Sequence, residues 1–213
     1  MMQSSSALSL IVTSALGLVS HVALAGPPGG LDSLSPHAYR AQPARVSDWI
    51  GGGSLAGGMG IQVGHGLAND DWRGVGATSG ALLLTGGLTE LTKVLSSRRR
   101  PYTWDPSVSA YGVQGYCRES APVRADDCKS FFSGHTALTA ASVFSTVHSM
   151  QRRGQLSTPS ARALAYSGAV LLTVSTASMR VLAGKHYVSD VAVGALVGGG
   201  IGMAIPGLFY RAD

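Results

Sequence analysis

Apolar and polar positions follow one another along the chain in long blocks, without the two-residue alternation of strands. Charged residues collect between the blocks, and each block is long enough for a helix of several turns. We therefore expect an all-α protein, a helical bundle of about five to six core helices. The pattern predicts helices over residues of about 47–68, 72–96, 134–152, 158–181 and 188–210.

The last predicted helix carries glycines at positions 194, 198 and 202, a four-residue spacing that lets another helix approach closely. Gly53/Gly57 and Gly60/Gly64 show the same spacing in the first predicted helix.

Residues 191–210 form a stretch of 20 residues without charge, which is enough to span a bilayer. The stretch is rich in Gly and Ala, however, so its insertion into a membrane is only modestly favourable. Close helix packing serves a water-soluble bundle equally well. Both architectures fit the pattern, and we favour a soluble or peripherally attached bundle.

The first 25 residues contain no Asp, Glu, Lys or Arg, and their apolar stretch ends in Ala23-Leu24-Ala25. This ending is typical of a signal-peptidase site and predicts a signal peptide over residues 1–25. Because a positively charged start is missing, an uncleaved N-terminal membrane anchor is the alternative. Residues 26–46 are rich in Pro, Gly and Ser and predict a linker, which leaves residues 47–213 as the helical domain.

Two cysteines, Cys117 and Cys128, lie eleven residues apart in a polar, irregular stretch. An even pair in a loop of an exported protein predicts a local disulfide. Closing so short a loop stabilises a fold by about 2–3 kcal/mol in the chain-entropy model. Neither the spacing nor the neighbours of the two residues suggest a zinc site.

The overall composition combines 45% hydrophobic residues with only 13% charged residues, about half the ordinary charged share. The formal net charge of +5 indicates an anionic partner of some kind. The densest basic run is Arg98-Arg99-Arg100, without interleaved aromatic residues. We therefore expect no nucleic-acid partner.

Three polar clusters stand at the ends of predicted helices. In the first, Lys93 ends the second helix and Arg100 follows seven residues later, before Pro101. A proline disfavours helix at the residue before it, so the second helix stops there. Guanidinium groups bind phosphate through paired hydrogen bonds, and a lysine adds a point charge. We interpret the neighbouring Arg98 and Arg99 as solvated charges.

The second cluster, Ser133-Gly134-His135, opens the third predicted helix. Ser133 can be an ordinary N-cap that accepts a hydrogen bond from the first turn. Alternatively, the free N–H groups and the positive end of the helix dipole hold an anion, with His135 beside it.

In the third cluster, Arg180 closes the fourth helix, and His186 and Asp190 stand at the start of the fifth. Residues four apart share one helix face, so the two side chains can meet. A carboxylate bonded to one imidazole nitrogen makes the other nitrogen a better nucleophile or base. A capping pair is the simpler alternative. The combination of cations from different helix ends with two histidines favours a phosphate site.

Taken together, the three clusters resemble the three-part signature of the phosphatidic acid phosphatase type 2 / vanadium haloperoxidase superfamily. They read Lys93-x6-Arg100-Pro101, Ser133-Gly134-His135 and Arg180-x5-His186-x3-Asp190. Order, spacing and placement at helix boundaries agree over roughly residues 47–210.

Two positions depart from the signature. Phe132 stands where the family usually has Pro, and Met179 separates Ser178 from Arg180, which are usually adjacent. Neither departure removes a charge or a proton-transfer group. They bear on loop conformation and substrate fit, and Phe132 is expected beside the leaving-group side of the pocket.

The resemblance implies a role for each matching residue. His186 would attack phosphorus and form a phosphohistidine, Asp190 would orient it, and His135 would protonate the leaving alkoxide and then activate water. The phosphoryl oxygens would be bound by Lys93, Arg100, Ser133, Gly134 and Arg180. Such a site needs no metal or other cofactor, and vanadate would bind it as a phosphate mimic.

We therefore expect an exported enzyme, periplasmic or membrane-associated, that hydrolyses phosphomonoesters or pyrophosphates without a metal. Lipid phosphates are the favoured substrates and a membrane surface the other expected partner. The alternatives are a vanadate-dependent haloperoxidase and a non-catalytic phosphate-binding bundle. No site role is expected for the other histidines, which are His21, His37, His65 and His148.

Overall fold

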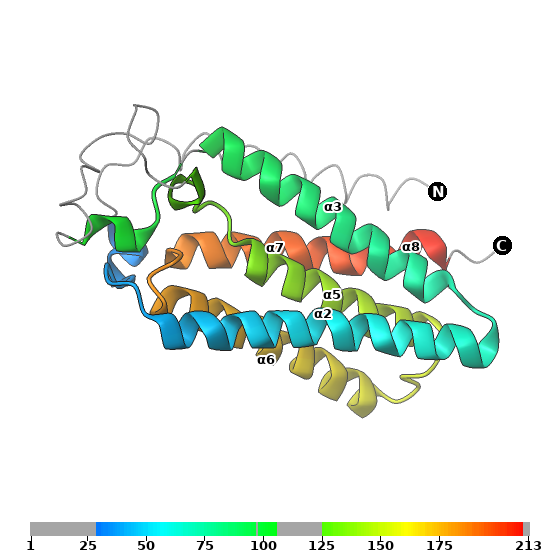
Figure 1. Cartoon of the computed structure of the whole chain (residues 1–213). Helices are drawn as coiled ribbons and strands as arrows, with labels where there is room; N and C mark the ends of the chain where they lie inside the picture. The colour runs from blue at the N-terminus through cyan, green and yellow to red at the C-terminus, as the bar shows by residue number, and fades with distance from the viewer. Residues whose placement is uncertain (1–28, 97, 106–124, 211–213) are drawn as a thin grey trace.

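The computed structural model describes residues 29–96, 98–105 and 125–210. In these residues five long helices form a bundle, and no strand occurs, so the predicted all-α fold is confirmed. Three 3₁₀ helices lie at one end of the bundle (Figure 1). The long helices are α2 (Ala41–Asn69), α3 (Arg73–Ser96), α5 (Gly134–Arg152), α6 (Pro159–Leu182) and α7 (Val188–Ala204), followed by the short α8 (Pro206–Phe209). The 3₁₀ helices are η1 (Gly30–Leu34), η2 (Pro101–Trp104) and η3 (Ala125–Cys128).

The central helix of the bundle is α5, which packs against α2, α3, α6 and α7 (Figure 1). Its buried positions are occupied mainly by small side chains, among them Ala137, Ala140, Ala141, Ser142 and Ser145. Because these side chains are small, four helices can approach α5 closely at the same time.

The glycines of α7 lie against the backbone of α5. A Cβ atom added at Gly198 would lie 2.0 Å from the carbonyl oxygen of Ala137. One added at Gly202 would lie 2.8 Å from the carbonyl oxygen of Ala141. The close helix approach predicted from the glycine spacing is therefore confirmed, and the partner helix is α5.

The glycines of equal spacing on α2 are placed differently. A Cβ atom at any of them would meet no described atom within 4 Å, so they face outward. The glycines that α2 buries are seven or eight residues apart. The outward set is Gly53, Gly57, Gly60 and Gly64, and the buried set is Gly51, Gly58 and Gly66.

The helix boundaries differ from the prediction at the start of α2 and at the end of α7. Helix α2 begins at Ala41, inside the segment 26–46 that was predicted as a linker, and η1 lies in that segment too. Pro43 falls in the first turn of α2, where a backbone N–H has no partner within the helix, so the proline is tolerated there. Helix α7 ends at Ala204 because Pro206 has no N–H to continue it.

The chain turns sharply between α6 and α7. Gly184 has a left-handed φ of +69°, and a Cβ atom there would lie 2.5 Å from the carbonyl oxygen of Ala38. The N–H of Arg40 donates to the carbonyl of Ala183 at 3.2 Å, and the N–H of Tyr102 donates to the carbonyl of Gly184 at 3.0 Å. The turn is therefore fixed from two sides, by the segment before α2 and by η2.

A hydrophobic cluster lies between α3, α5 and α7. Phe131 and Phe132 are fully buried in it, with their rings edge to face and 6.0 Å between centroids. Ala137 and Val197 pack in the same cluster. The surrounding helices therefore enclose the Phe132 side chain in the core, and its expected position beside the leaving-group side of a pocket stays a prediction.

Candidate active site

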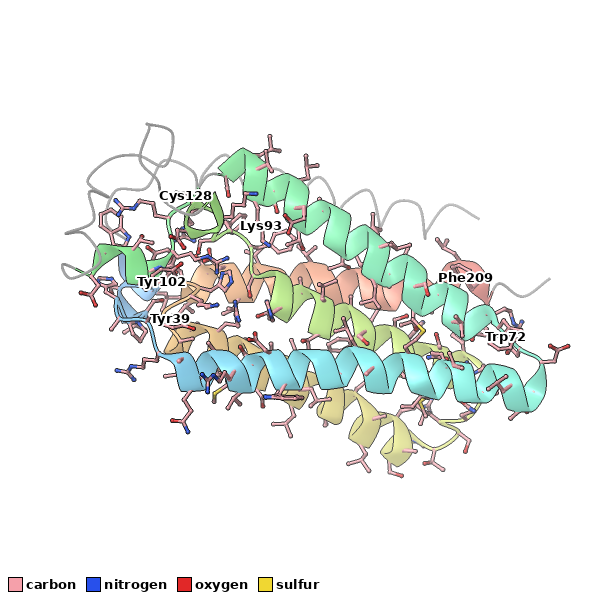
Figure 2. All side chains as sticks on the ribbon, viewed as in Figure 1. Tyr39, Trp72, Lys93, Tyr102, Cys128 and Phe209 are labelled. Carbon is pink, nitrogen blue, oxygen red and sulfur yellow. The ribbon has the colours of Figure 1, made fainter. Side chains whose placement is uncertain are left out.

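The three predicted motifs meet at one end of the bundle, called the site end below. Lys93 lies in the last turn of α3, Arg180 in the last turn of α6, and Asp190 in the first turn of α7. Figure 2 shows Lys93 and Tyr102 at the site end, whereas Trp72 and Phe209 lie at the opposite end.

His186 lies between Asp190 and Arg100. Its Nδ1 is 3.5 Å from Asp190 Oδ2, and its Nε2 is 3.3 Å from Arg100 Nη1. Burial lowers the pKa of His186 to about 3; Asp190 opposes this shift and the charge of Arg100 adds to it. The imidazole is therefore neutral near pH 7, the state in which a ring nitrogen can act as a nucleophile.

The carboxylate of Asp190 is fully buried and held by several donors. Arg98 Nη1 donates to Oδ1 at 2.5 Å, and Ser130 Oγ donates to Oδ2 at 2.5 Å. The backbone N–H of Tyr187 donates to Oδ2 at 3.0 Å. Because its position is fixed in this way, Asp190 can orient the His186 ring.

Arg98 is a site residue that the sequence interpretation missed. It was expected to be a solvated charge, yet only 9% of the residue is exposed. Besides Asp190, it binds Asp32 of η1 through Nη2 at 2.6 Å, and its guanidinium lies over the ring of Tyr187 at 4.1 Å. The sequence of three consecutive arginines does not show which of them are buried. Asp32, the partner of Arg98, lay in the segment predicted as a linker, where no contact with the site was expected.

Arg99 was also expected to be a solvated charge, and this too is wrong. Its Nη2 donates to the carbonyl of Thr103 at 2.9 Å, and its guanidinium lies over the ring of Trp104 at 4.3 Å. Burial lowers the pKa of Arg99 from its ordinary value. Arg99 therefore contacts η2 through two of its residues.

His135 lies in the first turn of α5, and 45% of its side chain is exposed. Its Nε2 is 3.0 Å from Asp48 Oδ1, and the same oxygen is 3.0 Å from Arg180 Nη1. Asp48 belongs to α2 and lies in none of the three motifs, so no signal in the sequence pointed to it. Arg180, by contrast, is almost fully buried.

The ionisation of His135 depends on the charges around it. Burial and the Arg180 charge lower its pKa to about 4, Asp48 opposes the shift, and Lys185 and Lys93 add to it. A phosphoryl group bound among these cations would raise the pKa of His135, because its negative charge would oppose theirs. Binding of the ester would therefore favour the protonated form of the ring.

The Lys93 side chain reaches the start of α5 beside Gly134. A Cβ atom at Gly134 would lie 3.6 Å from Lys93 Nζ and 3.0 Å from the Thr89 side chain. Lys93 also pairs with Glu90 at 2.8 Å within α3. An ammonium group thus stands beside the first turn of α5, next to His135.

Ser133 is the N-cap of α5. Its Oγ accepts from the N–H of Thr136 at 3.5 Å, and the two hydroxyl oxygens are 3.0 Å apart. Its own N–H donates to the carbonyl of Asp190 at 3.0 Å. A Cβ atom at Gly194 would lie 2.7 Å from the Ser133 carbonyl oxygen, so α7 rests directly on this cap. The structure shows the capping role, and the anion-binding role stays a prediction.

Two further predictions concern residues away from these contacts. His148 bonds the hydroxyl of Tyr166 through Nδ1 at 2.9 Å, near the opposite end of α5 from His135. The predicted disulfide pairs Cys128 with Cys117, and Cys117 lies outside the described residues, so the pairing stays a prediction.

Comparison with known proteins places the site in a family. The family model of the PAP2 superfamily matches residues 75–212. The chain belongs to the PAP2 superfamily. All eight predicted catalytic and phosphate-binding residues lie inside the matched region. The resemblance stated from the motifs and the predicted enzyme class, a phosphatase, are thereby confirmed at the level of the family.

One solved structure resembles this PAP2 chain along nearly its whole length. It is the crystal structure of the first transmembrane PAP2 type phosphatidylglycerolphosphate phosphatase from Bacillus subtilis. The TM-score is 0.57 at 17% sequence identity, and the match covers 98% of this chain and 94% of the other. At this identity the likeness shows a shared fold. No curated protein matches the chain.

Proposed function

We propose that this PAP2 protein removes phosphate from phosphomonoesters or pyrophosphates, foremost lipid phosphates, through a phosphohistidine intermediate. The observation that carries the proposal is the position of His186, with Asp190 at one ring nitrogen and Arg100 at the other. The Bacillus subtilis protein of similar fold is a phosphatidylglycerolphosphate phosphatase, which supports a lipid phosphate as substrate.

In the first step, Nε2 of His186 attacks phosphorus, a P–N bond forms and the P–O bond to the leaving group breaks. His135 gives its proton to the departing oxygen. The charges of Lys93, Arg100 and Arg180 stabilise the negative charge on the phosphoryl oxygens in the transition state. Asp190 stabilises the positive charge that the His186 ring acquires.

In the second step, a water molecule attacks the phosphohistidine and loses a proton to His135. The P–N bond breaks, His186 returns to its neutral form and inorganic phosphate is released. His135 has then regained the proton that it gave away, so the cycle is balanced. Its partial exposure allows it to meet both the leaving group and the water.

The intermediate can be tested by rapid quenching with an ester that carries a labelled phosphoryl group. The wild-type chain is expected to carry label in a base-stable, acid-labile form, as phosphohistidine does, and to release phosphate. His186→Ala is expected to lose both, by on the order of 10³-fold or more in turnover. His148→Ala is the matched control and should behave as wild type. Unchanged phosphate release by His186→Ala would contradict the proposal.

The substrate class can be tested with phosphatidic acid, an isoprenoid pyrophosphate and a soluble nucleotide, each with and without a chelator. We expect the highest kcat/KM on a lipid phosphate and no loss of activity with the chelator. A higher kcat/KM on the nucleotide would contradict a lipid phosphate as the substrate, but it would not contradict the phosphohistidine mechanism. Halide oxidation by peroxide, assayed with added vanadate, tests the haloperoxidase alternative.

Export also stays a proposal, because residues 1–25 lie outside the described part of the chain. Processing of the full chain after Ala25, seen by mass spectrometry of the mature protein, would support a cleaved signal peptide.

A further inference from the structure

The outer faces of the bundle are apolar. On α6, 66% of Leu171 and 53% of Val174 is exposed. Leu83 of α3, Leu196 of α7 and Ile61 of α2 are exposed to a similar or greater extent. Since α2, α3, α6 and α7 surround α5, these side chains are distributed around the bundle and do not form a single patch (Figure 1).

The inner faces of the same helices are polar or small. Helix α6 buries Ala169, Thr173 and Thr176, in addition to Arg180. Helix α3 buries Thr78, Thr85, Thr89 and Thr92, and α2 buries Ser47, Ser54 and Gln62. In water, the hydrophobic effect would place Leu and Val inside and Thr outside. Interfaces rich in Gly, Ala, Ser and Thr are those of helices packed within a bilayer.

Each outer helix contains one long segment without Asp, Glu, Lys or Arg. These segments are 16 to 21 residues long, which corresponds to about 24–32 Å at the helical rise. The hydrocarbon core of a bilayer is about 30 Å thick. We call the outward-facing apolar side chains of these segments the apolar belt. The segments are residues 49–69 of α2, 74–89 of α3, 163–179 of α6 and 191–209 of α7 and α8.

The site residues begin where these segments end. Asp48 comes directly before residues 49–69, and Asp190 directly before residues 191–209. Arg180 follows residues 163–179 directly. These site residues therefore lie at one edge of the apolar belt, at the depth that lipid headgroups occupy next to hydrocarbon.

Exposed tryptophans lie at both edges of the belt, one on α2 and one in the turn between α2 and α3. Trp49 opens the charge-free segment and is 81% exposed, and Trp72 follows its other end and is about half exposed. Tryptophan is enriched at both membrane–water interfaces because its ring is apolar and its N–H is polar.

We propose that the apolar belt is embedded in the hydrocarbon of a lipid bilayer, so that the bundle spans the membrane and the site end lies at one interface. The proposal reverses the preference for a soluble bundle that the Gly- and Ala-rich composition gave. By length and composition, one described helix, Val188–Phe209, could cross a membrane, and half of its apolar window is buried in the bundle. The mean hydropathy of a whole helix underestimates how apolar the outward faces of α2, α3 and α6 are, because the polar residues of these helices face inward.

A bilayer accounts for the belt better than a protein partner does. A second copy or another protein would cover one side of the bundle, whereas exposed aliphatic side chains occur on all four outer helices. The belt is also bounded by charges at both ends, with Asp48 and Arg180 at one end and Asp71 and Arg162 at the other. Two charged bands about one hydrocarbon thickness apart fit a bilayer.

Fractionation of cells that express the full chain tests the proposal. The protein is expected to stay in the membrane pellet through an alkaline carbonate wash and to need detergent for extraction. Release by carbonate, or a monodisperse protein in detergent-free buffer, would overturn it. Phosphate release from a soluble phosphomonoester, measured separately in detergent, tests the proposed function independently. His186→Ala should fractionate as wild type does.

Two substitutions on α6 provide a matched pair. Leu171 lies at the middle of the charge-free segment and Leu164 near its end, and both are more than half exposed. A lysine at the middle of a membrane-spanning segment is far more unfavourable than one near its end. Leu171→Lys should therefore lower the yield of detergent-extractable, monodisperse protein several-fold, and Leu164→Lys by less than about twofold. Equal yields would overturn the proposal, because on a water-facing surface both changes are harmless.

Tryptophan fluorescence in vesicles gives a second measurement that does not depend on folding yield. In phosphatidylcholine vesicles with brominated acyl chains, Trp49 and Trp72 should be quenched. Trp104 donates through Nε1 to the hydroxyl of Tyr187 at the site end and should be quenched less. The double variant Trp49→Phe/Trp72→Phe should lose most of the quenching. Equal quenching of this variant and the wild type would contradict the depth assigned to the belt.

Discussion

The two ends of the bundle use the same residue types in different ways. At the opposite end, Asp71 pairs with Arg73 at 2.8 Å, and the arginine side chain is 58% exposed. That pair lowers the pKa of Asp71 to about 2 and closes a turn between helices. At the site end, Arg98, Arg180 and Asp190 are buried. The same kinds of group thus close a turn at the end where the arginine is exposed, and form a buried cluster, the candidate active site, at the other end.

Burial changes what each charged group can do. At the opposite end the arginine of the pair is largely exposed, so the pair lies near water and its loss costs little. A buried carboxylate such as Asp190 depends on its donors, because an unpaired charge in the interior is strongly unfavourable. We therefore expect matched substitutions at the two ends to have unequal effects, and the following experiments measure that difference.

The largest difference is expected between the two histidines of α5. His135→Ala should lower kcat by about 10²–10⁴-fold, because the leaving oxygen loses its proton donor. The loss should be smaller with a nitrophenyl phosphate, whose leaving group departs without a proton. Steady-state kinetics with both esters would show this.

His148→Ala is the control at the other end of the same helix, where the ring bonds Tyr166. Its kcat should stay within about twofold of wild type. A similar loss in both histidine variants would mean that activity follows the integrity of α5 and not the chemistry of His135.

Next in size is the effect of Arg98. Arg98→Ala should lower the free energy of unfolding by about 3–5 kcal/mol, because it leaves the buried Asp190 carboxylate without its ion-pair partner. Arg73→Ala should cost about 1 kcal/mol or less, since its partner is near water. Thermal unfolding of the two variants in the same detergent compares them. Equal shifts in Tm would show that the Arg98 pair is no more buried in solution than the Arg73 pair.

A smaller contrast is expected along the glycines of α7. Gly194→Ala and Gly202→Ala should each destabilise by about 1–3 kcal/mol, because both press a methyl group against a carbonyl oxygen of α5. Only Gly194→Ala displaces Ser133. Only this variant should therefore have a lower activity per folded molecule. Activity per folded molecule, at a temperature where both variants are folded, separates the two effects. Gly60→Ala, on the open face of α2, should be harmless.

The smallest effect is a shift in pH dependence. Asp48 raises the pKa of His135, so Asp48→Asn should lower it further. If His135 acts as the acid, kcat/KM falls as the pH rises through this pKa, and the falling limb should therefore move to lower pH in the variant. Asp71→Asn should leave the limb in place. A limb that moves to higher pH in Asp48→Asn would contradict the assigned contact.

Much of the site was predictable because its residues lie at fixed spacings next to helix ends. Local spacing is enough to recognise pairs such as Lys93 with Arg100 and His186 with Asp190. The bundle then brings the helix ends that carry them together. Asp32 and Asp48 could not be found in this way. They come from a segment without periodicity and from the first turns of α2, and their partners are more than 60 residues away.

Burial was the property that the sequence conveyed least. Arg98 was interpreted as solvated because nothing in a run of three arginines shows that Arg98 is buried as well as Arg100. Gly57 and Gly198 share the same spacing pattern, yet the first faces outward and the second meets a carbonyl of α5. Phe132 was noted because it stands where the family usually has Pro, and the sequence did not show that its side chain is buried in the core. In each case the decisive information is which helix lies opposite, a property of tertiary packing.

The turn at Gly184 gives the N-terminal segment a role in the site. That turn is fixed by the segment just before α2, while η1 and α2 bring Asp32 to Arg98 and Asp48 to His135. This segment and both aspartates precede residue 75, where the family match begins. A fragment cut at the border of the family match would keep the cations of the pocket and lose two of its carboxylates. A chimaera that joined residues 75–212 to the N-terminal segment of another family member would retain every signature residue and still carry a different electrostatic balance at the pocket.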